Sequence, residues 1–216
     1  MVRMTEVVKN LIIINVLMFF GTLMLMGEPV FDGSGRLMDL NRGVLAMFYP
    51  ALKEFQPFQL VTHMFMHADL FHLIFNMFML YIFGSSLESL WGARRFLFFY
   101  FFSGFGALLL YLTIIFFEIN FLGNPRAAGS WMMGASGAIM GVLAAFALKF
   151  PERQLMLIFP PIPVKAKYLA LALIALDLFG GFGHFGSTGI AHFAHLGGVF
   201  AGGLLVLYWE RYGSKL

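Results

Sequence analysis

Two side chains in this sequence, Ser136 and His195, have the types and surroundings that nucleophilic catalysis requires. Ser136 lies in Gly-Ala-Ser-Gly at 134–137, where the glycines permit a sharp turn and let other groups approach the hydroxyl closely. His195 ends the run Ala-His-Phe-Ala-His at 191–195. A histidine that meets a serine hydroxyl is a base beside a nucleophile. Each motif is weak by itself, because serine is also a common helix N-cap and a lone histidine is more often structural.

Small residues on two predicted helices indicate how the serine and the histidine could meet. On the helical wheel of 190–209, one set of residues falls within about 60°: Ala191, His195, Gly198 and Gly202. The segment after Ser136 carries a matching stripe, formed by Gly137, Gly141, Ala144 and Ala145. Such stripes let two helices pack at close range. If these stripes meet, the imidazole of His195 reaches the hydroxyl of Ser136, whereas His192 points toward the edge of its stripe.

Three histidines and an asparagine, at 63, 67, 72 and 76, form the second polar group. On one continuous helix, His63 and His67 share a face, and His72 and Asn76 share another that is about 140° away. One helix could not aim all three histidines at a metal, and the HExxH motif is absent, so we predict no metal site. The pair His72 and Asn76 presents two donors side by side, as a developing negative oxygen requires. Helix–helix hydrogen bonds are the alternative for that pair, and we expect His63 and His67 to brace the neighbouring loop.

The composition indicates an integral membrane protein. Of the 216 residues, 60% are hydrophobic, 28 are Phe and only 12% are charged, whereas soluble domains are about 25% charged. This composition predicts the lipid bilayer as a partner. The net charge of +3 is small and its basic residues are scattered, so we predict no binding to nucleic acid. The absence of cysteine excludes disulfides and thiolate metal sites, and nothing in the sequence calls for a cofactor.

Hydropathy divides the chain into six predicted spans within a single domain, 1–216. The spans cover about 10–27, 62–84, 94–117, 135–150, 166–182 and 190–209. A span needs about 20 residues, so the fourth and fifth are short. We read the first as a retained span and not as a cleaved signal peptide. The long connection 28–61 contains an apolar patch at 43–52 that suggests a short helix in the membrane interface.

The distribution of lysine and arginine predicts that both termini lie in the cytoplasm. With the N-terminus inside, cytoplasmic segments hold ten of the 14 basic residues: Arg3, Lys9, Arg94, Arg95, Lys149, Arg153, Lys165, Lys167, Arg211 and Lys215. The opposite side holds four: Arg36, Arg42, Lys53 and Arg126. This excess follows the positive-inside rule, and we expect a multi-pass protein of the cell inner (plasma) membrane.

With these elements in order, the chain resembles the rhomboid family of intramembrane serine proteases. The resemblance covers about 57–209 and rests on "HMFMHADLFHLIFN", "GASGAIMG", "DLFG" and "AHFAHLGG". It implies an all-α, six-transmembrane-helix bundle with a short, buried fourth helix and a long membrane-associated first loop. It also implies that Ser136 is the nucleophile and His195 the general base, and that His72, Asn76 and the Ser136 backbone N–H form the oxyanion hole. The substrates would be single-span membrane proteins, cleaved near the extracytoplasmic face.

The sequence departs from the family pattern at two places. Phe58-Gln59 stands where the family often has Trp-Arg, which bears on loop anchoring, and Met140 replaces a tyrosine that stacks on the catalytic histidine in some members. We assign Asp177 to helix bracing and not to a catalytic triad. The alternative functions are a catalytically inactive rhomboid-like binding protein and a small polytopic transporter, which would need an internal repeat or a charged pathway.

Overall fold

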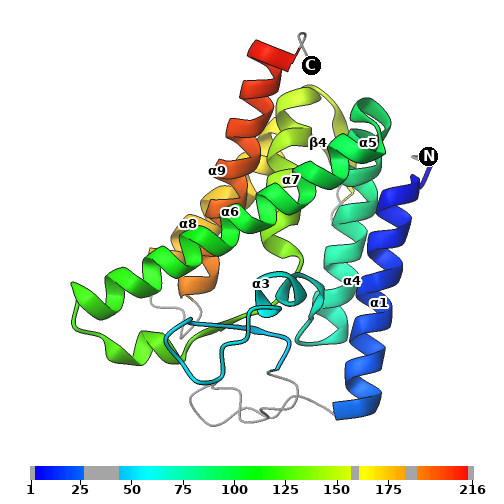
Figure 1. The fold of residues 1–216 in the computed structure, drawn as a ribbon. Coiled ribbons are helices and arrows are strands. Elements are labelled where there is room, and N and C mark those ends of the chain that lie inside the picture. Colours follow the sequence, from blue (N-terminus) through cyan, green and yellow to red (C-terminus); the bar gives the residue numbers. More distant parts are fainter. Residues whose placement is uncertain (1–2, 27–43, 157–160, 183–188, 214–216) are drawn as a thin grey trace.

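The computed structural model describes residues 3–26, 44–156, 161–182 and 189–213, and these are mainly helical (Figure 1). In chain order the helices are α1 (Glu6–Met26), α3 (Gln59–Thr62), the 3-10 helix η1 (His63–Phe65), α4 (Leu70–Met79), the π-helix η2 (Leu80–Gly84), α5 (Ser85–Trp91), α6 (Ala93–Asn120), the 3-10 helix η3 (Pro125–Gly129), α7 (Ser136–Lys149), α8 (Ala166–Phe182) and α9 (Gly189–Tyr212). The strands β1 (Met47–Phe48) and β2 (Trp131–Met132) pair antiparallel, as do β3 (Gln154–Met156) and β4 (Pro163–Lys165).

Among the described residues, four helical segments are long and apolar enough to cross a membrane, by length and composition. They are Glu6–Leu25, Leu70–Trp91, Ala93–Asn120 and His192–Tyr212. The helices Ser136–Lys149 and Ala166–Leu176 are apolar but shorter. The chain is therefore a mostly helical integral membrane protein, and the count of six spans stays a prediction. Figure 1 shows that the first turn of α1 and the last turn of α9 point toward the same end of the bundle.

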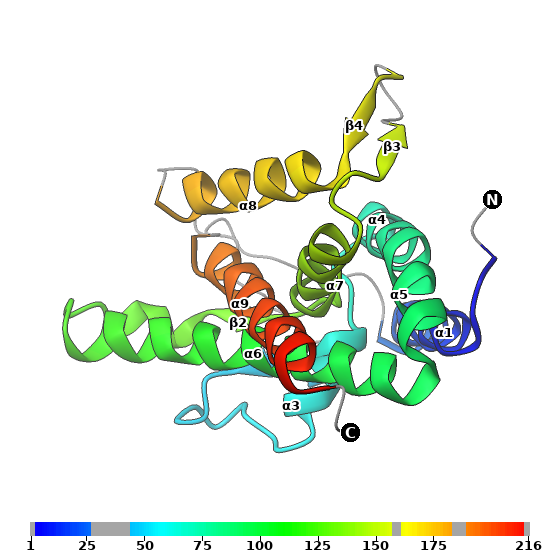
Figure 2. The same ribbon diagram turned by 90° about the horizontal axis from the view of Figure 1, so that it is seen from above.

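Helix α7 lies at the centre of the bundle (Figure 2). Every residue from Gly137 to Phe146 is buried. The predicted contact between two small-residue stripes is present, because a side chain at Gly198 would place its Cβ 1.9 Å from the Gly137 carbonyl oxygen. One turn further, a Cβ at Gly202 would lie 2.9 Å from the Gly141 Cα. Glycine at these positions lets the backbones of α7 and α9 touch directly.

The prediction of a continuous helix over 62–84 was wrong. The chain leaves the helical conformation at Met66, with φ −93° and ψ 146°, and helix α4 begins only at Leu70. Asp69 causes the restart: its backbone is extended, and its carboxylate accepts the His72 N–H at 2.8 Å as an N-cap. His63 and His67 therefore do not share a helix face. The positions of the three histidines on one continuous helix can no longer be used to exclude a metal site. Within the described residues no group of three His, Cys, Asp or Glu side chains could hold a metal ion.

The segment 44–58, which contains strand β1, forms a loop before helix α3. The described part of the predicted interface helix, 44–52, consists instead of turns and strand β1. Gln59 anchors this loop: its Nε2 donates to the carbonyl oxygens of Val44 at 2.9 Å and Glu54 at 3.0 Å. One of the two departures from the family pattern thus supplies a buried amide that fixes the loop backbone.

Candidate active site

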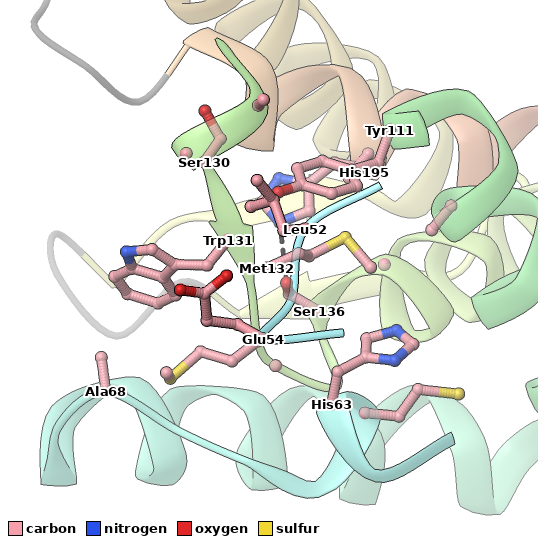
Figure 3. Close-up of a pocket in the computed structure, with 18 of the residues that line it drawn as sticks. Leu52, Glu54, His63, Ala68, Tyr111, Ser130, Trp131, Met132, Ser136 and His195 are labelled. Carbon is pink, nitrogen blue, oxygen red and sulfur yellow. Dashed lines mark hydrogen bonds between the residues drawn. The ribbon is translucent and has the colours of Figure 1, made fainter. Parts of the chain in front are cut away.

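Ser136 and His195 are in direct contact. His195 Nε2 lies 2.7 Å from Ser136 Oγ, a hydrogen-bond distance that Figure 3 marks with a dashed line. Ser136 is the first residue of α7, and Ala135 occupies the N-cap position without a side-chain hydrogen bond. Ser136 is therefore not an N-cap, and that alternative is wrong. The hydroxyl faces the imidazole of His195 at the start of a helix, where the first N–H groups have no partner within the helix.

The turn that precedes Ser136 depends on Gly134. Its φ of +128° is one that residues with a side chain rarely adopt. A Cβ at this position would also lie 3.1 Å from His72 Nε2 and 3.4 Å from Ser136 Oγ. The ring of His72 and the serine hydroxyl therefore border the same small space, which a side chain at position 134 would fill.

His72 presents a hydrogen-bond donor to this space. Its Nδ1 lies 3.5 Å from the Ala68 backbone nitrogen, from which it accepts a hydrogen bond. A neutral imidazole that accepts at Nδ1 carries its proton at Nε2. The Nε2–H of His72 is thus directed toward the side of the site where Ser136 lies, and Asp69 fixes the start of the helix from which it projects.

Asn76 lies one turn further along α4. It is buried, and its Nδ2 donates to the His72 carbonyl oxygen at 2.8 Å. The cavity that holds Ser136, His195 and His72 is not lined by Asn76 among its described residues. The structure therefore brings three of the four predicted site residues to one cavity, and the role of Asn76 stays a prediction.

The cavity above the dyad has a volume of about 1040 Å³. Its described walls come from the loop 51–54, the segment 63–72 that includes η1 and the start of α4, the segment 125–134 that includes β2, and the facing parts of α6, α7 and α9. Figure 3 shows Leu52 and Glu54 on the loop side and Trp131 and Met132 on the strand side. These walls could not be predicted from the sequence, because strands of two residues give no periodic pattern.

His63 connects the loop to the serine turn. Its Nδ1 donates to the Gln59 carbonyl oxygen at 2.7 Å, and its own carbonyl oxygen accepts the Gly134 N–H at 2.8 Å. This matches the bracing role predicted for His63. His67 packs its ring against that of His72, with centroids 5.0 Å apart.

The sequence also drew attention to Met140, His192 and Asp177. Met140 is buried in the core around α7. The ring of His192 lies 6.3 Å from that of His195, centroid to centroid. The side chain of Asp177 falls outside the described residues.

The chain is similar in sequence to a known protein family and to several curated proteins. Residues 54–211 match the protein-family model for the Rhomboid domain. The chain is 35% identical over 187 residues to the human protein named presenilin-associated rhomboid-like protein, mitochondrial, a match that covers 84% of this chain and 45% of that protein. It is 33% identical over 151 residues to the Saccharomyces cerevisiae rhomboid protein 1, mitochondrial, covering 70% and 41%. It is 29% identical over 170 residues to the Toxoplasma gondii rhomboid-like protease 3, covering 77% and 57%. The chain thus spans about half the length of these relatives.

Proposed function

The chain belongs to the rhomboid family, and on that premise we propose that it is an intramembrane serine endopeptidase with a Ser136–His195 dyad. The observation that carries the proposal is the 2.7 Å contact between His195 Nε2 and Ser136 Oγ inside a large cavity. A structural serine–histidine pair needs no such cavity, whereas a protease must admit a peptide. The substrates are single-span membrane proteins.

The reaction begins with proton transfer to His195. Nε2 takes the Ser136 proton as Oγ attacks the carbonyl carbon of the peptide bond, and the C–N bond breaks when the same proton passes to the leaving amine. Water then hydrolyses the acyl-enzyme, with His195 again as the base. The imidazole must be neutral to accept the proton.

The oxyanion of the tetrahedral intermediate would meet two kinds of donor. The Ser136 backbone N–H belongs to the first turn of α7, whose N–H groups have no partner within the helix. The Nε2–H of His72 borders the same space. Asn76, the third candidate, donates one Nδ2–H to the His72 carbonyl oxygen and has a second Nδ2–H that could serve the oxyanion.

Loss of one oxyanion donor typically lowers kcat by about 10²–10³. We expect Asn76→Ala to show this loss in single-turnover and steady-state cleavage of a single-span substrate. A change confined to KM would instead assign Asn76 to substrate binding or to the support of α4.

The direct test uses purified protein in detergent micelles. Incubation with a single-span test substrate should give one main cleavage product with the unsubstituted protein and none with Ser136→Ala, while both proteins retain similar thermal midpoints. Absence of cleavage by the folded, unsubstituted protein across a panel of substrates would contradict the proposed function.

We further propose that six helices cross the membrane, with both termini in the cytoplasm, and that the cavity opens on the opposite side. Ser136 to Lys149 covers 14 residues, about 21 Å of helix, against a hydrocarbon core of about 30 Å. Ser136 then lies on the order of 10 Å below the outer surface, where an irregular backbone needs a protein or water-filled surrounding. The plasma membrane stays our expectation for the location; two of the relatives above carry mitochondrial names.

Because the chain has no cysteine, Ser136→Cys provides a single thiol to test the orientation. A small, membrane-impermeant thiol reagent should label it in right-side-out vesicles and not in inverted vesicles. The reverse pattern would overturn the orientation, and no labelling from either side would exclude an open, water-filled cavity.

A further inference from the structure

The catalytic cavity contains one carboxylate that the proposed reaction does not use. Glu54 lies in the loop after β1, is half-buried, and is the only acidic side chain among the described residues that line the cavity. Its backbone is held by the bond from Gln59 Nε2 to its carbonyl oxygen. Figure 3 shows its carboxylate pointing toward the indole of Trp131.

The residues next to Glu54 and the strand that carries Trp131 pack together at the cavity wall. Its neighbours Leu52 and Phe55 pack in the same apolar cluster as Trp131 and Met133. Trp131 is held in turn by the pairing of β2 with β1, opposite Phe48. The loop and the strand thus form two fixed walls, with a carboxylate on one and an aromatic ring on the other.

No ion pair or side-chain hydrogen bond engages the Glu54 carboxylate within the described part of the chain. Two cations, Lys53 and Arg126, line the same cavity, but both are exposed and neither pairs with Glu54 there. A half-buried carboxylate has lost part of its water and gains from an added cation. An indole face attracts the same kind of group, and it also covers the apolar stem of lysine or arginine.

We propose that Glu54 and Trp131 form a subsite that selects a lysine or arginine side chain of the substrate. The inference rests on the proposed function, because it assumes that a peptide enters this cavity. It adds a determinant of substrate choice: the preferred substrates carry a basic residue in the segment next to the bond that is cleaved. Glu54 acts in binding and takes no part in the proton transfers at Ser136.

Binding to a protein that cannot cleave tests the subsite without any need for turnover. In the Ser136→Ala background, we would measure the Kd for a series of single-span test substrates, each with one lysine placed along the segment that enters the membrane. Each lysine substrate is compared with a reference substrate that has methionine at the same position. At one position we expect lysine to bind about tenfold more tightly than methionine, which corresponds to one charge-assisted contact.

Substitution of Glu54 should change the ratio of the Kd for the methionine substrate to the Kd for the lysine substrate. With Glu54→Gln, which preserves the shape of the side chain, the ratio should fall to about one. With Glu54→Lys, a substrate with glutamate at that position should become the better ligand. The matched control is Glu118→Gln, because Glu118 carries the same charge at the exposed end of α6 and does not line the cavity. This control should keep the tenfold ratio.

A second experiment keeps Glu54 in the protein and changes the substrate. Replacement of the substrate lysine by Nε-acetyl-lysine removes the charge and keeps the stem, so it should abolish the preference. A lysine preference that survives in Glu54→Gln, or no position at which lysine is preferred, would overturn the subsite. If the preference is found but the unsubstituted protein cleaves no substrate, the protease proposal fails and the subsite stands.

Discussion

Helices α7 and α8 are both short and apolar, and the protein surrounds them in opposite ways. Helix α7, with 14 residues, is buried from Gly137 to Phe146. Helix α8, with 17 residues, lies on the outside of the bundle in Figure 2 and exposes Leu171 by 63% and Leu176 by 66%. Among the side chains of α8 that the structure describes, Ala166 and Ala170 are the buried ones. A short apolar helix can thus either be enclosed by protein or lie at the edge of the bundle.

The contrast accounts for the position of Ser136, the proposed nucleophile, at the start of α7. A sharp turn and a hydroxyl at membrane depth are tolerated only where protein or water surrounds them. Helix α7 receives that surrounding from α9 through direct glycine contacts, whereas α8 offers aliphatic side chains to its surroundings. The site therefore depends on close backbone packing, and this dependence can be broken at single residues.

The largest effect should come from Gly198→Val. Its side chain would collide with the Gly137 carbonyl oxygen, which lies 1.9 Å from the Cβ position, and would push α9 and His195 away from Ser136. We expect loss of cleavage and a clear fall in the thermal midpoint. The matched control is Gly203→Val on the same helix, where a Cβ meets nothing within 4 Å, and which should keep most activity. Equal activity of the two variants would show that the α7–α9 contact is not required.

A matched pair of leucines compares the two short helices directly. Leu143 on α7 is fully buried, whereas Leu171 on α8 is 63% exposed. Leu143→Ala should reduce the free energy of unfolding by about 2–5 kcal/mol, because it leaves a cavity in the core. Leu171→Ala should change it by no more than about 0.5 kcal/mol. Chemical unfolding in detergent measures both, and similar losses would contradict the surroundings described for α8.

These helices also show which features the sequence could predict. The contact of α7 with α9 was predictable, because glycine and alanine recur at helical spacing on both segments. The start of α4 was not, because Asp69 interrupts a long apolar run and its capping role becomes evident only from its bond to His72. The walls formed by Glu54 and Trp131 depend on strands of two residues that lie far apart in the chain. Such pairing is decided by tertiary packing and leaves no local pattern.

The smallest effect should occur at the entry to α8. There Glu152 pairs with Lys165 at 2.7 Å and also with Lys167, and these two lysines lower the pKa of the carboxyl to about 2. Because its pKa is below the ordinary value of 4.5, this carboxylate stabilises the fold above pH 4.5 and loses that effect as the pH falls toward 2. The pair is exposed, so Glu152→Gln should lower the thermal midpoint at pH 7 by less than about 2 °C. A larger decrease, or one that persists at pH 2, would show that Glu152 acts by another route.

The central claim is that His195 activates Ser136 across the α7–α9 contact, and a serine-directed covalent probe tests it most directly. A fluorophosphonate should add to the purified, unsubstituted protein at one site, identified as Ser136 by mass spectrometry of the intact protein and its peptides. In His195→Ala the labelling rate should fall by at least about 10³, whereas His192→Ala should keep most of it. Labelling of Ser136 at an unchanged rate in His195→Ala would contradict the account.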